Sequence, residues 1–226
     1  MKKRTKTIIA VIAGAAILIG GIWMINESRY PNVPAFDDHF TREFLNKDKK
    51  VDDGFYEFKS KTGQYTMWFP EEYQLIHENK GDYSINGKDY ERWVASSKKF
   101  FNNKNEISYI NVELADKVKK NEDINVESLF KKDLHVNMPK KVETANASIY
   151  YDSAYTYFKG TEEKVVKNNI KYVPNTYVAY IADKNTDRVI ELYYKYTGEV
   201  LTEKQGKKQE KLIVKILQSV NFHEEK

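Results

Sequence analysis

Side chains able to perform acid–base or metal chemistry are few in this 226-residue chain, which has four histidines and no cysteine. The histidines show neither HxH nor HxxxH spacing and stand at His39, His77, His135 and His223. The lack of cysteine excludes thiol catalysis, disulfides and thiolate-held metal sites. We therefore expect no catalytic residue, no metal ligand and no cofactor.

One short stretch, Asp37-Asp38-His39, gathers metal-capable groups. It fits either a metal site or the first turn of a helix in which Asp38 caps the N-terminus. We favour the cap. Asp52-Asp53-Gly54 similarly indicates a turn before a strand, because no calcium-loop spacing follows it.

Enzyme motifs that need a fixed context are absent. There is no nucleophile elbow, phosphate-binding loop, dinucleotide fingerprint or zinc-protease helix. The 33 acidic residues do not single out the carboxylate pair of a glycosidase. A hydrolase of peptidoglycan or glycan therefore stays open as the alternative to a binding protein.

Tyrosine is the chemically versatile side chain that remains, with 17 in the chain and a concentration in the last third. Alternation along a strand sends the members of a Tyr-Tyr doublet to opposite faces, so we expect some tyrosines on a face that no helix covers. Ordinary strand propensity explains such a content, and so does an aromatic surface that binds a partner. The candidate partner-binding residues are Tyr151, Tyr155, Tyr157, Tyr194 and Tyr196.

The leading segment Thr7–Ile25 carries no charge. As a helix its nineteen residues span about 28 Å, near the thickness of a bilayer core. A cleaved signal and a buried soluble helix are the alternatives. The length of the segment and the lack of a small-x-small site near its end favour an uncleaved anchor. Leu18-Ile19-Gly20-Gly21 resembles a lipoprotein signal in which Gly21 replaces the lipidated cysteine.

Charge sets the orientation of that anchor and limits the partners. Four of the 37 basic residues lie within the first six positions, and the rest balance the acidic residues. The positive-inside rule therefore places the N-terminus in the cytoplasm and the remainder outside. A neutral remainder argues against nucleic acid. The excess of Lys, Asn and Tyr suggests a low-GC Gram-positive bacterium.

Short strands dominate after residue 55. Two strands flank Lys61-Thr62-Gly63, where Gly63 is expected to take a positive φ. A second pair spans 90–97 and 106–114, and three further strands occupy 148–160, 176–183 and 189–198.

Two segments have helical periodicity. Val126, Leu129, Phe130 and Leu134 lie on one face of a helix that we expect Asn125 to cap. Thr202 and Gln205 form a capping-box pattern before an apolar face, Leu212, Ile213, Ile216, Leu217 and Val220.

These elements predict an α+β fold, an antiparallel sheet of about six to eight strands with two packed helices, preceded by one transmembrane helix. The expected parts are a cytoplasmic segment 1–6, an anchor 7–25, a stalk 26–54 with one short helix near Asp38–Leu45, and an extracytoplasmic domain 55–226.

The layout resembles the PsbP-like superfamily. The likeness covers roughly residues 55–222 and rests at residue level on "FPEEYQLI" (69–76) and "ILQSVNF" (216–222). It implies an exported bacterial domain and no catalytic residue. We therefore predict a single-pass membrane protein of the cell envelope that binds a protein or other envelope partner through an aromatic sheet surface.

Overall fold

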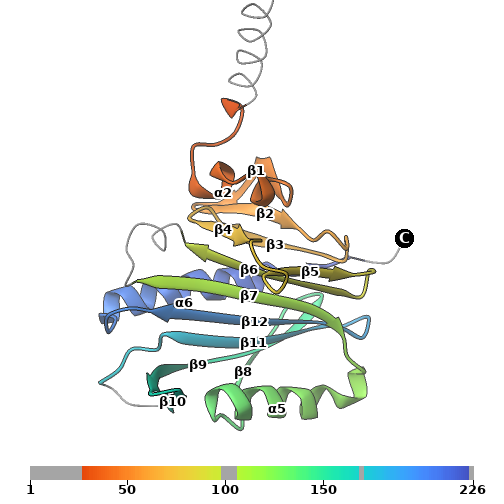
Figure 1. Cartoon of the computed structure of the whole chain (residues 1–226). Coiled ribbons are helices and arrows are strands. Elements are labelled where there is room, and N and C mark those ends of the chain that lie inside the picture. Colours follow the sequence, from red (N-terminus) through yellow and green to blue (C-terminus); the bar gives the residue numbers. More distant parts are fainter. Residues whose placement is uncertain (1–26, 98–105, 168–170, 224–226) are drawn as a thin grey trace, which may run out of the picture.

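The computed structural model describes residues 27–97, 106–167 and 171–223 (Figure 1). The expected anchor, Thr7–Ile25, lies outside these residues. Within them, no helix is both long enough and apolar enough to cross a bilayer.

Helices form the smaller part of the described chain. Two short ones lie near its start, one follows the central strands and one precedes the C-terminus. They are α2 (Pro34–Asp37), α3 (His39–Arg42), α5 (Glu122–Leu134) and α6 (Glu203–Gln218), with a 3-10 turn, η1, at Lys119–Asn121.

The strands form two sheets, and every pairing is antiparallel. The small sheet has the order β1-β2-β3-β13, from Leu45–Asp52, Phe55–Lys59, Tyr65–Pro70 and Asn221–Phe222. The large sheet runs β10-β9-β11-β12-β7-β6-β4, with β5 on β6 and β8 on β9. Its strands are β4 (Tyr73–Ile76), β5 (Tyr83–Asn86), β6 (Tyr90–Ser97), β7 (Ile107–Asp116), β8 (Lys140–Glu143), β9 (Ala147–Lys159), β10 (Glu162–Val166), β11 (Thr176–Asp183) and β12 (Arg188–Thr197).

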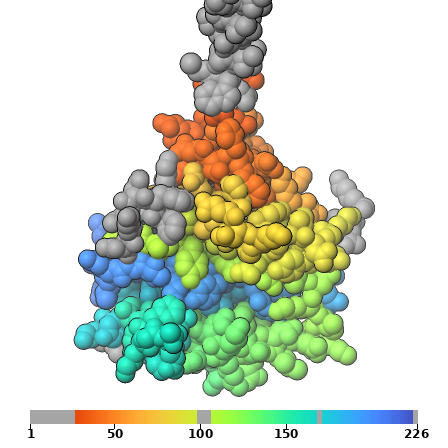
Figure 2. Space-filling view, viewed as in Figure 1, coloured from red at the N-terminus to blue at the C-terminus, as the bar shows by residue number. Residues whose placement is uncertain are grey.

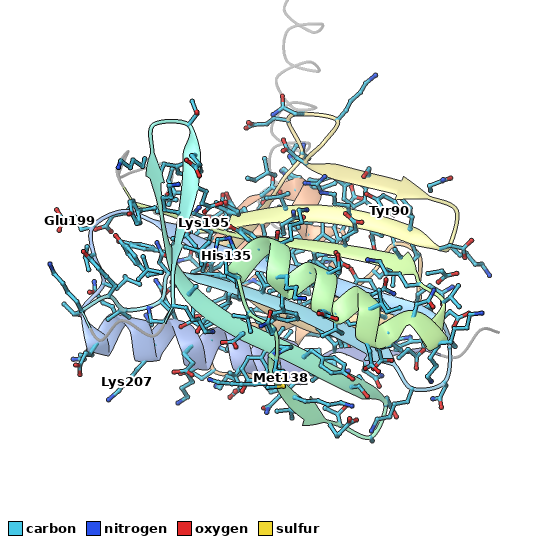
Figure 3. The ribbon with its side chains drawn as sticks, turned by 90° about the horizontal axis from the view of Figure 1, so that it is seen from below. Tyr90, His135, Met138, Lys195, Glu199 and Lys207 are labelled. Carbon is cyan, nitrogen blue, oxygen red and sulfur yellow. The ribbon has the colours of Figure 1, made fainter. Side chains whose placement is uncertain are left out.

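Helices cover the large sheet on both faces. Val126 and Phe130 of α5 pack with Tyr180 of β11 on one face, and Ile213 of α6 packs with Tyr177 of β11 on the other. In Figure 3, α5 crosses in front of the strands and α6 lies behind them. All eight residues of β11 are buried as a result. The α+β class is confirmed, but the expectation of a sheet face without a helix is wrong, and the described strands outnumber the predicted six to eight.

Residues 34–52, expected to belong to a stalk, are part of the fold. Ala35, Phe36 and Phe44 are at most 2% exposed and lie in the same core cluster as α6. Charged residues separate these apolar residues in the sequence. The pattern therefore gave no indication that the segment packs in the core. Asp38 caps α3 by accepting a hydrogen bond from the Thr41 N–H at 2.7 Å, as predicted.

Several local predictions hold. Gly63 has a φ of 75° in the β2–β3 hairpin, the pairs β6–β7 and β11–β12 form, and the Thr202–Gln205 capping box opens α6. Asn125 does not cap α5, because the helix begins at Glu122, one turn earlier than the apolar pattern indicated.

Candidate functional site

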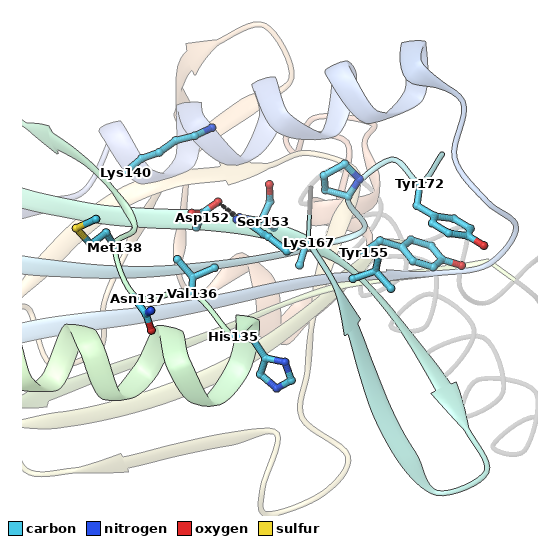
Figure 4. Close-up of a pocket in the computed structure, with 13 residues that line it drawn as sticks. His135, Val136, Asn137, Met138, Lys140, Asp152, Ser153, Tyr155, Lys167 and Tyr172 are labelled. Atoms are coloured by element: carbon cyan, nitrogen blue, oxygen red, sulfur yellow. Dashed lines mark hydrogen bonds and ion pairs between the residues drawn. The ribbon is translucent and has the colours of Figure 1, made fainter. Parts of the chain in front are cut away.

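A cavity of about 780 Å³ opens along β9, between the start of β8 and the end of β10 (Figure 4). The segment that follows α5 forms one wall, and the segment that precedes β11 forms another. The lining side chains are His135, Val136, Asn137, Met138, Lys140, Asp152, Ser153, Ala154, Tyr155, Val166, Lys167, Tyr172 and Pro174.

The register of β9 creates this opening. β8 pairs with residues 148–151 of β9, and β10 pairs with residues 155–159. Ser153 therefore lies in a gap between two strands that share one edge of β9. A backbone group at such a gap needs another partner, because unpaired buried N–H and C=O groups are costly.

An ion pair completes the edge at this gap. The Asp152 carboxylate accepts a hydrogen bond from the Ser153 N–H at 2.7 Å, and the Lys167 ammonium donates to the Ser153 carbonyl at 2.8 Å. Lys167 also pairs with Asp152 itself, whose side chain is 11% exposed. These two charges form the floor of the cavity and are already engaged with each other.

Stacked tyrosines form the opposite side of the cavity. The rings of Tyr155 and Tyr172 are 4.6 Å apart and nearly parallel, at 11°. Tyr157 continues the stack at 6.1 Å from Tyr155 and is 42% exposed. The stack therefore leads from the cavity wall to the surface, along the β9–β10 hairpin that projects from the sheet in Figure 3.

Exposed apolar side chains lie at the cavity and on the hairpin next to it. Met138 is 88% exposed and Phe158 is 62% exposed. Lys195 of β12 holds the hairpin in place, because its buried ammonium pairs with Glu163 of β10 and lies 4.7 Å from the centre of the Phe158 ring. Met138 lines the cavity, whereas Tyr157 and Phe158 lie on the adjoining hairpin, on opposite faces of β9. We call these three residues the apolar rim.

The five predicted tyrosines lie in three places. Tyr155 and Tyr157 belong to the stack. Tyr151 is half-buried beside the cavity, with the Lys140 ammonium 5.6 Å from its ring centre. Tyr196 is half-buried and lines a smaller cavity beneath α6.

Tyr194 is 1% exposed, so its prediction as a partner contact is wrong. It lies on the face of β12 that α6 covers, and burial raises the pKa of its hydroxyl well above the usual value.

Tyr172 was not among the candidates, although it completes the stack. It lies in an irregular segment, and nothing local in the sequence indicates its contact with Tyr155. Only the tertiary fold brings the two rings together.

The chemistry available in the large cavity favours contact over catalysis. Asp152 is the one carboxylate in its lining, and it is ion-paired. Across the described residues, no three His, Asp or Glu side chains gather where they would hold a metal ion. Aromatic faces, an apolar rim and a few polar groups are typical of a binding site.

Comparison with known proteins gives one match. The model of the YvcA_Mog1p family, described as "Putative lipoprotein YvcA", matches residues 31–221. No curated protein and no solved structure matches this chain. Lipoproteins are anchored to a membrane outside the cytoplasm, so the family indicates an exported, envelope-associated domain. Because the match spans most of the chain, from before α2 to β13, the protein belongs to the YvcA_Mog1p family.

Proposed function

We propose that this protein is a membrane-anchored binding protein of the bacterial cell envelope that holds a segment of a protein partner in the cavity along β9. The stacked tyrosines and the exposed Met138 support this proposal most directly, because exposed aromatic and apolar side chains beside a cavity are typical of interaction surfaces. Met138 and the stacked tyrosines suit such contact, since a flexible thioether adapts its shape and tyrosine adds a hydroxyl to a large ring.

The anchor of this chain is proposed to be a helix in place of a lipid. The family is described as lipoproteins, but this chain has no cysteine to acylate and carries Gly21 at the corresponding position. The uncharged segment Thr7–Ile25 is long enough to span the bilayer. The basic residues before it favour a cytoplasmic N-terminus. A PsbP-like fold and a Gram-positive source are consistent with this setting.

The placement of the cavity supports binding away from the membrane. Residues 27–52 lie at one end of the molecule, and β8, β10 and α5 lie at the other (Figure 1, Figure 2). A partner at β9 therefore meets the end of the domain opposite to its point of attachment.

Site-specific photocrosslinking on intact cells tests the binding site. A photoreactive residue at position 158 or 138 of the full chain is expected to trap the same protein, because position 138 lines the cavity and position 158 lies on the hairpin next to it. The adduct should decrease severalfold when Tyr172→Ala removes the stack. Position 124 is the control, since Ile124 is 66% exposed on α5 and does not line the cavity. An equal adduct from position 124, or one indifferent to Tyr172→Ala, would refute the site.

Membrane extraction tests the anchor. The full chain is expected to stay in the membrane through alkaline and high-salt washes without incorporating labelled fatty acid. A polypeptide that starts after Trp23 and is free in the medium would contradict an uncleaved helix.

A further inference from the structure

A second cavity, of about 210 Å³, lies beneath the first turns of α6. It is separate from the cavity along β9 and shares no lining residue with it. The strands that form it are the start of β4, the end of β6, the start of β7 and the end of β12. At roughly 30 Å³ for each molecule of liquid water, its volume corresponds to about seven waters.

Neutral hydroxyl groups form the floor of this second cavity. The hydroxyls of Tyr73 and Ser108 are 2.9 Å apart, and Ser108 donates to Ser97 at 3.0 Å. Tyr194 joins them through its hydrogen bond with Tyr73. Burial raises the pKa of Tyr73 to about 12, so these groups stay protonated in ordinary conditions. A buried hydroxyl network of this kind supplies fixed polar positions without charge.

Charged groups surround that floor. Glu72 and Glu106 line the cavity, and Lys208 of α6 lines it as well. None of the three forms an ion pair with another residue that the structure describes. Glu72 and Lys208 are exposed and Glu106 is half-buried, so a ligand entering the cavity can reach all three charges.

A buried acceptor also lacks a donor. The Oε1 atom of Gln209, which lines the same cavity, is inaccessible to solvent and has no hydrogen-bond partner within the described part of the chain. Leaving such an oxygen unsatisfied costs about 1–3 kcal/mol. An N–H or O–H group inside the cavity would remove that cost.

We propose that the cavity beneath α6 binds a free amino acid with a cationic side chain. Two carboxylates and the Gln209 carbonyl are suited to accept hydrogen bonds from two ammonium groups, and Lys208 is suited to the ligand's carboxylate. A ligand with two ammonium groups and one carboxylate matches the charges of Glu72, Glu106 and Lys208 one for one.

A divalent cation fits this site less well. Calcium takes six to eight oxygen ligands and magnesium six. The region described contains no group of three or more acidic or histidine side chains arranged to hold a metal ion. Lys208 would also repel a metal ion, whereas it attracts a carboxylate.

Calorimetric titration of the detergent-solubilised full chain with L-lysine tests the proposal. Binding is expected with L-lysine and should weaken about tenfold or more with L-norleucine, which lacks the side-chain ammonium, and with cadaverine, which lacks the carboxylate. Losing one charge-assisted hydrogen bond accounts for a change of that size.

Variants of the chain locate the ligand. Glu106→Gln and Lys208→Met are each expected to weaken L-lysine binding about tenfold or more. Glu210→Gln should leave it unchanged, because Glu210 is exposed on the same helix and does not line the cavity. Unfolding midpoints close to that of the wild type would show that each variant is folded.

Three results would overturn the proposal. They are no heat with L-lysine, equal binding of L-norleucine, or saturable binding of calcium or magnesium that these substitutions abolish. The photocrosslink from position 158 reports on the other cavity, so this site and the proposed partner site fail or succeed separately.

Discussion

Two tyrosines on the large sheet differ in burial and are therefore expected to contribute differently to stability. Tyr194 is 1% exposed and Tyr157 is 42% exposed. Tyr194→Ala is expected to lower the free energy of unfolding by about 3–5 kcal/mol, as for other large core aromatics. Tyr157→Ala should change it by no more than about 0.5 kcal/mol. Urea unfolding of both variants measures the difference, and equal losses would contradict the assignment of these side chains to core and rim.

Arg188 forms an ion pair in which both side chains are buried. Its guanidinium pairs with Asp183 at 2.8 Å, and both side chains are at most 7% exposed. It also donates to the carbonyl of His223 at 2.6 Å, next to β13.

Arg188→Met is therefore expected to cost about 3–5 kcal/mol, because it leaves the Asp183 charge buried and unpaired. Adding Asp183→Asn should restore part of that loss. The exposed pair Lys131–Glu127 is the matched control, where Lys131→Met should cost about 0.3–0.5 kcal/mol. Comparable losses at the two pairs in denaturant unfolding would show that burial of Arg188 has no effect on its contribution.

Among the elements, α5 ends on an unfavourable backbone conformation. His135 has φ 54° and ψ 38°, the left-handed region that glycine favours at the end of a helix. It is the one non-glycine residue with a positive φ among those described.

His135→Gly is expected to raise the free energy of unfolding by about 0.5–1 kcal/mol, because glycine removes the steric cost at Cβ. His135→Ala is the control and should bring no gain, since alanine has the same Cβ. A stabilisation by alanine equal to that by glycine in thermal unfolding would assign the effect to loss of the imidazole instead.

Sequence patterns predicted the features that are determined by residues close together in the sequence. Gly63, the Thr202–Gln205 box and the apolar face of α6 each lie within one turn or helix, so their geometry follows from spacing alone. The hairpin β11–β12 was also predictable, because a polar turn separates two strands that are rich in aromatic and β-branched residues.

The rest depends on contacts between distant segments. A short helix was expected where α3 lies, but α2 is too short for periodicity to reveal. Phe36 of α2 and Phe44, which follows α3, gain a place in the core only when β2 and β3 form it. The gap at Ser153 arises from the registers of β8 and β10, which no local pattern specifies. Of the candidate site, Tyr155 and Tyr157 were predicted, whereas Tyr172 and Met138 were not.

For the whole molecule, the start of the folded unit matters most. Phe36 and Phe44 are at most 2% exposed, and removing two such side chains costs about 6 kcal/mol or more, a large share of the roughly 5–15 kcal/mol of a typical domain. A chain that starts at Phe55 is therefore expected to aggregate or unfold, whereas one that starts at Glu27 should fold. Circular dichroism and unfolding curves of the two chains decide this, and cooperative unfolding of the shorter one would restore the idea of a stalk.

Acid is expected to loosen the molecule through its ion-paired carboxylates. Hydrogen bonds from Lys184 and then Lys141 lower the pKa of Glu143 to about 2 from 4.5. The hydrogen bond from Lys215 lowers the pKa of Asp52. Because each folded pKa lies below its unfolded value, the unfolded chain binds more protons in acid.

For Glu143, the stabilisation is complete above about pH 4.5 and is lost as the pH falls toward 2. Asp133 works in the opposite direction, since burial raises its pKa. The melting temperature should fall across this range, and less steeply in Glu143→Gln. An identical pH dependence in that variant would exclude Glu143 as a contributor.

The placement of residues 27–52 and of the β9 cavity at opposite ends of the domain has a consequence for where the protein works. A domain of this size is roughly 40 Å across, so the proposed anchor before residue 27 would hold the tyrosine stack about that far above the lipid headgroups. Small integral proteins lying flush with the bilayer would be out of reach. The cavity along β9 would instead be within reach of cell-wall polymers, of secreted proteins and of membrane proteins with large extracellular domains.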